Sequence, residues 1–134
     1  MSKYKDLFCS HLDEIGIKYT DINEFWLSIN YPGDKLKSIP VAVLFDEDGY
    51  PLVQIRCWEI VNAGSKKSKF LEICNQLNAE NRWVKFFVDD QGDLTACFDA
   101  RIDESNCGEH CLEYFLRIAR IVDEVYPQFI YALV

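Results

Sequence analysis

Hydrophobic and polar positions recur along this chain with periods that predict both helices and strands. Apolar residues at helical spacing predict a helix over residues 3–15, and Gly16 follows where a left-handed C-terminal cap is expected. Strict alternation then predicts a strand over residues 25–31. Two further strands are predicted over residues 39–45 and 52–61, and the acidic turn between them contains Asp-Gly, a typical hairpin sequence.

The next part of the chain is predicted to form a helix followed by a second hairpin. Ser65 is the expected N-cap of a helix that reaches about Leu77. Residues 82–103 alternate between apolar and polar on either side of an acidic turn at residues 89–93. This pattern predicts two antiparallel strands, and the turn acids have the chemistry of a hairpin connection.

A long helix is predicted to follow the hairpin and to complete the fold. Asn106 and Glu109 have capping-box spacing at its start, and we expect Pro127 to end or kink it, leaving one further helical turn. The predicted order is therefore α-β-β-β-α-β-β-α. Short turns between strands require antiparallel pairing, and the helices do not strictly alternate with strands. We therefore predict an α+β fold, an antiparallel sheet packed against helices, in a single domain over residues 1–134.

Composition and charge narrow the range of functions. Hydrophobic residues make up 49% of the chain, enough to build a core, and the net charge is −8. An acidic surface repels phosphate backbones and anionic lipids, so we expect neither nucleic-acid nor membrane binding. The first residues lack the apolar stretch of a signal peptide, and four of the six cysteines fall in predicted core elements. We therefore expect a cytoplasmic protein with reduced thiols.

One local cluster carries metal- or thiol-type side chains. Cys107, His110 and Cys111 lie near one face of the last predicted helix, and His11 could supply a fourth ligand for zinc. This is not a standard zinc spacing, so we predict no metal or other cofactor. Cys107 at a helix start could instead be an activated thiol. A metal- or thiol-site protein is therefore kept as an alternative.

The remaining motifs give no support for catalysis. The two acidic turns lie between strands, unlike the helix-flanked loops that bind calcium. The sequence has two histidines, no glycine-rich phosphate loop and no basic stripe interleaved with aromatics. We therefore predict that the protein is not an enzyme, and keep a small-ligand sensor with a pocket between sheet and helices as a further alternative.

Aromatic residues on both faces of the second hairpin indicate a binding surface. Alternation places Trp83 and Phe87 on one face, Phe86 and Phe98 on the other, and Trp58 on the polar face of the third strand. A single sheet covered by helices on one side would leave some of them exposed, and exposed apolar patches mark partner sites. Trp58, Trp83 and Phe87 are therefore the predicted partner-binding residues, unless the apolar C-terminal tail covers them.

The segment of residues 77–103 combines a helix ending in Leu-Asn, a Trp-x-Lys-Phe strand, an acidic turn with Gly-Asp-Leu and a closing acidic residue. These are Leu77, Asn78, Trp83, Lys85, Phe86, Gly92, Asp93, Leu94 and Asp103. In this combination the segment resembles the YbjN-type domain family. The element order over residues 3–126 also resembles the type III secretion chaperone-like fold.

This resemblance implies a small bacterial cytosolic protein with a regulatory function and no catalytic residues to transfer. The related secretion chaperones are small acidic homodimers that hold partner proteins in extended form. We therefore expect a non-enzymatic protein-interaction module, chaperone-like or regulatory, whose partner is another protein or a second copy in a homodimer.

Overall fold

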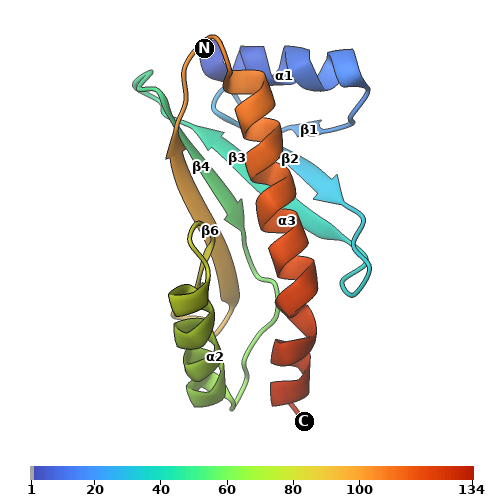
Figure 1. Ribbon diagram of the computed structural model, residues 1–134, viewed down its shortest axis with the longest axis vertical. Coiled ribbons are helices and arrows are strands. Elements are labelled where there is room, and N and C mark those ends of the chain that lie inside the picture. The colour runs from blue at the N-terminus through green and yellow to red at the C-terminus, as the bar shows by residue number, and fades with distance from the viewer. Residues whose placement is uncertain (1) are drawn as a thin grey trace.

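The computed structural model describes residues 2–134 as three helices and one six-stranded antiparallel sheet (Figure 1). The helices are α1 (Lys3–Ile15), α2 (Lys67–Glu80) and α3 (Cys107–Ala132). The strands are β1 (Thr20–Asp21), β2 (Trp26–Tyr31), β3 (Ile39–Phe45), β4 (Leu52–Cys57), β5 (Lys85–Val88) and β6 (Leu94–Arg101). The α+β class is confirmed, with β1 added to the predicted order.

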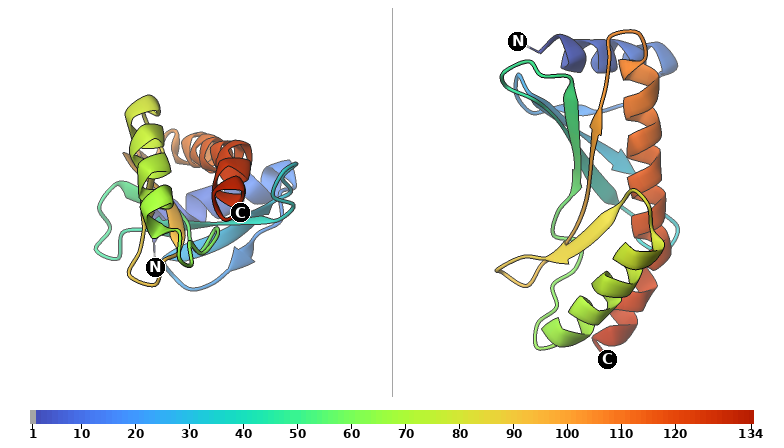
Figure 2. Two further views of the ribbon diagram at one scale, coloured as in Figure 1. Left: turned by 90° about the horizontal axis from the view of Figure 1, so that it is seen from below. Right: turned by 60° about the vertical axis from the view of Figure 1, so that its left-hand side comes forward.

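The two hairpins join into one sheet because β4 pairs with β6, giving the strand order β1-β2-β3-β4-β6-β5. α3 packs across β3, β4 and β6, whereas α2 packs on β5. Figure 2 shows α1 and α2 at opposite ends of the molecule, with α3 running between them. The long C-terminal helix is therefore the element that links both ends.

The α1 helix has the caps that local chemistry predicts. Ser2 Oγ accepts a hydrogen bond from the Lys5 backbone N–H at 3.2 Å, and Gly16 adopts a left-handed φ of 79°. The Lys5 side chain is buried and donates to Asp21 Oδ1 and to the Asn23 carbonyl, each at 2.6 Å. This pairing holds β1 against α1. The strand was missed in the sequence because its two residues are exposed and show no alternation.

The start of α3 lies against α1 with very little space between them. A Cβ atom on Gly108 would stand 2.7 Å from the Cβ of His11, which is too close for any larger residue. The Cys107 thiol donates to the Tyr4 carbonyl at 3.3 Å. Close approach of two helices requires a residue without a side chain at the crossing, and Gly108 supplies it.

The core is formed by the inward side chains of the sheet and by one stripe of α3. The buried residues of α3 are Cys107, Cys111, Phe115, Ile118, Ala119, Val122, Val125 and Phe129. This stripe continues past Pro127, so of the two expected effects, an end or a kink, Pro127 does not produce the end of the helix. Proline inside a helix lowers the stability of the fold by about 3 kcal/mol. Burial of the Phe129 side chain, two residues later, adds roughly 1.5–3 kcal/mol of stability and so offsets most of this cost. That burial keeps the last turns of the helix in place.

One predicted N-cap is wrong, and the other is in its expected position without the expected side-chain hydrogen bond. α2 begins at Lys67, and Lys66 rather than Ser65 occupies its N-cap position, without a side-chain hydrogen bond. Asn106 does precede α3, but its side chain makes no capping bond. Instead the Asp103 carboxylate accepts from the backbone N–H groups of Ser105 and Asn106, at 2.9 and 3.2 Å. Asp103 therefore forms a turn that precedes α3, and the capping-box hydrogen bond is not made.

The third predicted strand is shorter than expected. It ends at Cys57 rather than residue 61, since Glu59 adopts a φ of 52°, which an extended strand does not allow. Beyond it a single bridge pairs Asn62 with Asp93. Trp58 therefore follows the strand instead of belonging to it.

The Asp123 side chain on α3 binds the loop between β2 and β3 through hydrogen bonds. Its carboxylate accepts hydrogen bonds from the backbone N–H groups of Asp34, Lys35 and Leu36 at 3.0, 2.8 and 2.9 Å. These donors, that of Leu36 foremost, hold the pKa of Asp123 below its ordinary value, because they stabilise the ionised form. The loop thus depends on a negative charge at residue 123.

We expect Asp123→Asn to lower the free energy of unfolding at neutral pH by roughly 1–2 kcal/mol, since a neutral amide accepts backbone hydrogen bonds more weakly. A carboxyl whose pKa is lowered by folding adds stability above its unfolded pKa, near 4, and loses it as the pH falls through the folded value. Urea unfolding at pH 7 and pH 3 should therefore show wild type and variant converging in acid. An equal difference at both pH values would contradict this account.

Candidate functional site

The family-type motif of the second hairpin closes the free edge of the sheet. β5 is an edge strand, and the Asn78 side chain pairs with it like a neighbouring strand. Asn78 Oδ1 accepts from the Phe86 N–H at 2.8 Å, and Asn78 Nδ2 donates to the Phe86 carbonyl at 2.9 Å. Lys85 Nζ donates to the carbonyls of Asn78 and Asn81 at the end of α2. These bonds explain the Leu-Asn and Lys-Phe residues of the motif, since they anchor α2 and cover an otherwise exposed strand edge.

Trp83 lies on the helix-covered side of this hairpin, beside Phe98. The strand begins only at Lys85, so alternation does not reach Trp83, and its expected place on the same face as Phe87 is wrong. The Trp83 ring meets the ring of Phe98 edge-on, with centroids 5.9 Å apart. The guanidinium of Arg117, on α3, lies 5.2 Å from the centre of the Trp83 ring. Trp83 thus bridges the hairpin and the long helix, with 52% of its surface exposed.

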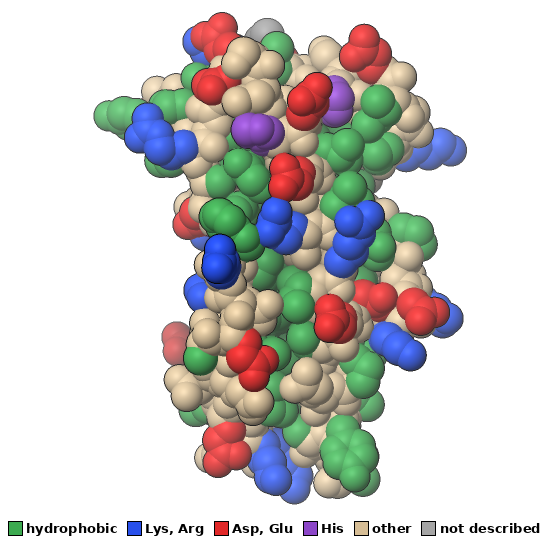
Figure 3. Space-filling view, in the orientation of Figure 1, with side chains coloured by type: hydrophobic (Ala, Val, Ile, Leu, Met, Phe, Trp, Pro, Cys, Tyr) green, Lys and Arg blue, Asp and Glu red, His purple; other side chains and the backbone are tan. Residues whose placement is uncertain are grey.

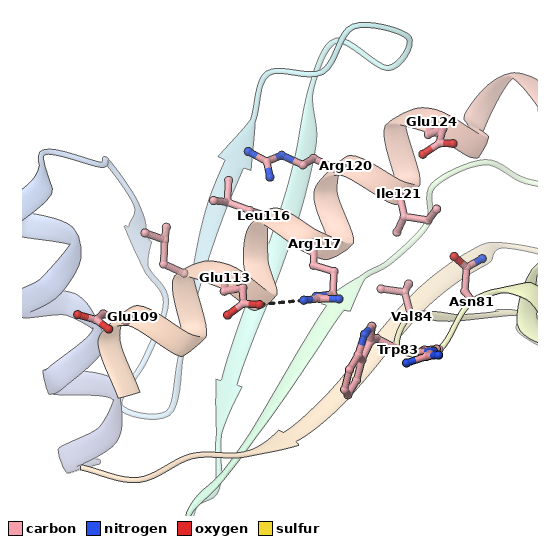
Figure 4. A pocket seen from close by; sticks show the side chains of 12 residues that line it. Asn81, Trp83, Val84, Glu109, Glu113, Leu116, Arg117, Arg120, Ile121 and Glu124 are labelled. Carbon is pink, nitrogen blue, oxygen red and sulfur yellow. Dashed lines mark hydrogen bonds and ion pairs between the residues drawn. The ribbon is translucent and has the colours of Figure 1, made fainter. Parts of the chain in front are cut away.

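Two cavities flank this Trp83–Arg117 pair. We call these two cavities together the Trp83 groove. One has a volume of about 570 Å³ and lies between α3 and the segment before β5; the other, about 400 Å³, lies between α3 and β6. Trp83, Glu113 and Arg117 line both cavities. Figure 4 shows the larger one, with Arg117 reaching from α3 toward the tryptophan. Arg117 is held by a hydrogen bond to Glu113 Oε1 at 2.8 Å.

The groove has an apolar floor and a charged rim. Leu112, Leu116 and Ile121 of α3 contribute half-buried side chains to the larger cavity. They belong to a second stripe of the helix, beside the one that faces the core. Figure 3 shows both basic and acidic side chains beside a strip of hydrophobic surface along the middle of this face. An apolar floor with polar groups above it is the usual form of a binding site.

Arginine is concentrated at this site although the protein as a whole is acidic. Four of the five arginines in the chain, Arg82, Arg101, Arg117 and Arg120, line the two cavities, whereas the net charge is −8. Sequence reasoning missed this set because its members come from the loop before β5, the end of β6 and the middle of α3. Only Arg117 and Arg120 show a local signal, the three-residue spacing that places both on one side of a helix.

The three predicted partner-binding residues do not form one surface. Trp58 is 45% exposed and packs edge-on against Trp26, with centroids 5.8 Å apart. Phe87 is 46% exposed on β5, opposite Thr95 of β6. Within residues 2–134 no ring contact joins Trp58, Trp83 and Phe87 to one another. No aromatic ring of the described C-terminal tail contacts any of these three rings. Phe129, the buried ring of the tail, packs inward on Phe70 and Phe86.

The Cys107, His110 and Cys111 cluster is divided between the core and the groove. The two thiols are buried with their Sγ atoms 4.0 Å apart. The hydrogen bond with Cys107, together with burial, raises the pKa of the Cys111 thiol. His110 lines the smaller cavity and its ring lies 6.1 Å from that of Tyr114. No group of three His, Cys, Asp or Glu side chains in residues 2–134 is arranged to hold a metal ion. A buried thiol that donates to a backbone carbonyl also lacks the accessibility of a reactive cysteine.

The helices of residues 2–134 include none that is both long and apolar enough to cross a membrane. Comparison with protein families gives a match over residues 35–130 to the YbjN model, which is described as "Putative bacterial sensory transduction regulator". The chain belongs to the YbjN family. The match includes residues 77–103 and so confirms the resemblance seen in that segment. The YbjN match also contains every residue named above for the Trp83 groove. No curated protein matches the chain.

Proposed function

We propose that this YbjN family member is a non-enzymatic regulatory module that acts in the cytoplasm by binding a protein partner in the Trp83 groove. The observation that carries the proposal is the half-exposed Trp83 over an apolar floor. The family description as a regulator supports a role in signalling. The six cysteines are all free, which supports a reducing compartment.

The exposure of Trp83 is large enough to matter for binding. A tryptophan buries up to about 250 Å², so half exposure leaves on the order of 100 Å² to be covered. Covering that area contributes about 2–3 kcal/mol at 25 cal/mol per Å². Tryptophan and arginine are also the residues most enriched at the energetic centres of interfaces. Trp83 and Arg117, stacked on one another, supply both at the middle of the groove.

A homodimer remains a prediction, and the structure limits how it could form. Pairing of two β5 edges would require the Phe86 N–H and carbonyl, which Asn78 already occupies. At this edge a second copy would therefore have to bind through side chains, such as the exposed ring of Phe87. Sedimentation equilibrium of wild type and Phe87→Ala would measure this directly, with a dimer weakened by the substitution as the expected result.

We expect Trp83→Ala to abolish capture of the partner. The purified protein is immobilised, and proteins retained from an extract of the native host are identified by mass spectrometry. Tyr50→Ala is the control, because it also removes an exposed aromatic ring but lies outside the groove and outside the predicted partner-binding set. Retention of the same proteins by wild type and Trp83→Ala would overturn the proposed function, provided that both variants unfold at the same urea concentration as wild type.

A further inference from the structure

The Trp83 groove has a length, a charge pattern and a floor that together describe its occupant. We propose that it binds an acidic stretch of polypeptide, about six residues long, with carboxylates on either side of an apolar side chain. This inference rests on the proposed function and specifies the chemistry of the partner. Its evidence is the shape of the groove and the pairing state of its arginines.

The length of the groove favours a peptide over a small anion. Its larger cavity follows α3 from Glu109 to Glu124, which at 1.5 Å per residue is roughly 22 Å. An extended chain advances about 3.3 Å per residue, so six residues, which span about 20 Å, fit within it. A single nucleotide or amino acid would occupy only one end.

The charge pattern favours carboxylates. The side chains of Arg82, Arg101 and Arg120 form no ion pair or hydrogen bond within the described residues, so their guanidinium groups are available to a ligand. A guanidinium binds a carboxylate through two parallel hydrogen bonds, which gives geometric selectivity as well as charge.

Asp99 and three glutamates line the two cavities together with the four arginines, so the groove as a whole is neutral on a protein of net charge −8. Asp99 is paired with Arg56 and Glu113 with Arg117, which leaves three guanidinium groups and two carboxylates of the lining unpaired among the described residues. The groups available to a ligand therefore carry a small positive excess.

The acidic residues of the groove argue against a continuous polyanion. Glu109 and Glu124 line the two ends of the larger cavity, and Glu113 lies between them, paired with Arg117. A nucleic acid, with a phosphate at every step, would place negative charge beside these carboxylates. A peptide can place its carboxylates at the arginines only. Between them, an apolar side chain would contact Trp83, Leu116 and Ile121.

The test uses three synthetic six-residue peptides and the intact protein. The first has the sequence Glu-Asp-Phe-Glu-Asp-Leu, the second replaces each acid with its amide, and the third replaces each acid with lysine. Binding is followed by the intrinsic fluorescence of tryptophan and by calorimetry. We expect the acidic peptide to bind at least tenfold more tightly than either analogue, and its affinity to fall with added salt.

The arginines are tested by charge reversal. The double variant Arg82→Glu/Arg120→Glu should lose at least tenfold in affinity for the acidic peptide and lose its preference over the amide analogue. Lys18→Glu/Lys37→Glu is the control, since it changes the net charge by the same amount at exposed positions outside the groove and should alter affinity less than twofold. Arg120→Lys keeps the charge but removes the bidentate fork, and an intermediate loss is expected.

The outcomes separate this inference from the proposed function. Equal binding of the three peptides, or tighter binding of ATP or a short RNA than of the acidic peptide, would overturn the inference. If Trp83→Ala still abolished partner capture in that case, the proposed function would stand with a different partner chemistry. If the acidic peptide bound as expected but Trp83→Ala captured the same proteins as wild type, the proposed function would fail while the acidic-peptide preference of the groove held.

Discussion

Replacement of Phe129 by alanine is expected to lower the free energy of unfolding by about 3–5 kcal/mol, the usual cost of removing a buried phenylalanine. Phe129 is fully buried near the end of α3. Its ring lies 5.0 Å from that of Phe70 on α2 and 6.3 Å from that of Phe86 on β5. The substitution would therefore leave a cavity where three elements meet and would also release the helix beyond Pro127.

Ile130→Ala is the matched control for this effect. Ile130 is the next residue along the same helix, but 37% of it is exposed, so its truncation should cost far less. Urea unfolding followed by circular dichroism measures both variants, and the loss of helical signal before unfolding reports on the last turns of α3. Similar midpoints for the two variants would mean that the helix after Pro127 is not packed as described.

Gly33→Ala should be the second most damaging substitution, with a loss of about 1–3 kcal/mol or more from overpacking. A Cβ at this position would stand 2.1 Å from the Leu36 carbonyl oxygen and 2.6 Å from Asp123 Oδ1. Neither group can retreat easily, because one is backbone and the other holds three hydrogen bonds. The loop between β2 and β3 would have to leave α3.

Two further variants locate the cause of the Gly33→Ala effect. Asp34→Ala changes an exposed side chain in the same loop and should leave the midpoint of thermal unfolding nearly unchanged. In an Asp123→Ala background, Gly33→Ala should still destabilise the protein, since the contact with the Leu36 carbonyl remains. If Gly33→Ala were harmless in the wild-type background, the close packing of this loop on α3 would be refuted.

The sequence predicted those elements whose boundaries are set by residues near to one another. The α1 helix and strand β3 have the expected bounds, because the apolar period and Gly16 in one case, and two turns in the other, act within a few residues. Predictions failed where a distant residue competes with a local signal. Burial of Phe129 against Phe70 and Phe86 outweighs the helix-breaking effect of Pro127.

The candidate site was only partly predictable for the same reason. Trp83 was identified from its alternation with apolar positions of the second hairpin, but its position in a groove depends on β5 starting at Lys85. His110, predicted as a possible metal ligand, lines the smaller cavity instead. Burial of Cys107 and Cys111 at the crossing of α1 and α3 removes the accessible thiol that the sequence allowed.

By itself, then, the sequence determined the α+β class, the antiparallel hairpins and the family, since periodicity and turn chemistry act over short stretches of chain. Only the tertiary structure decided that β4 pairs with β6 and that the end of α3 packs on α2 and β5. It also brought arginines that are as many as 38 positions apart, from Arg82 to Arg120, into one groove. Such placement depends on packing between distant segments, and no local pattern of residues encodes it.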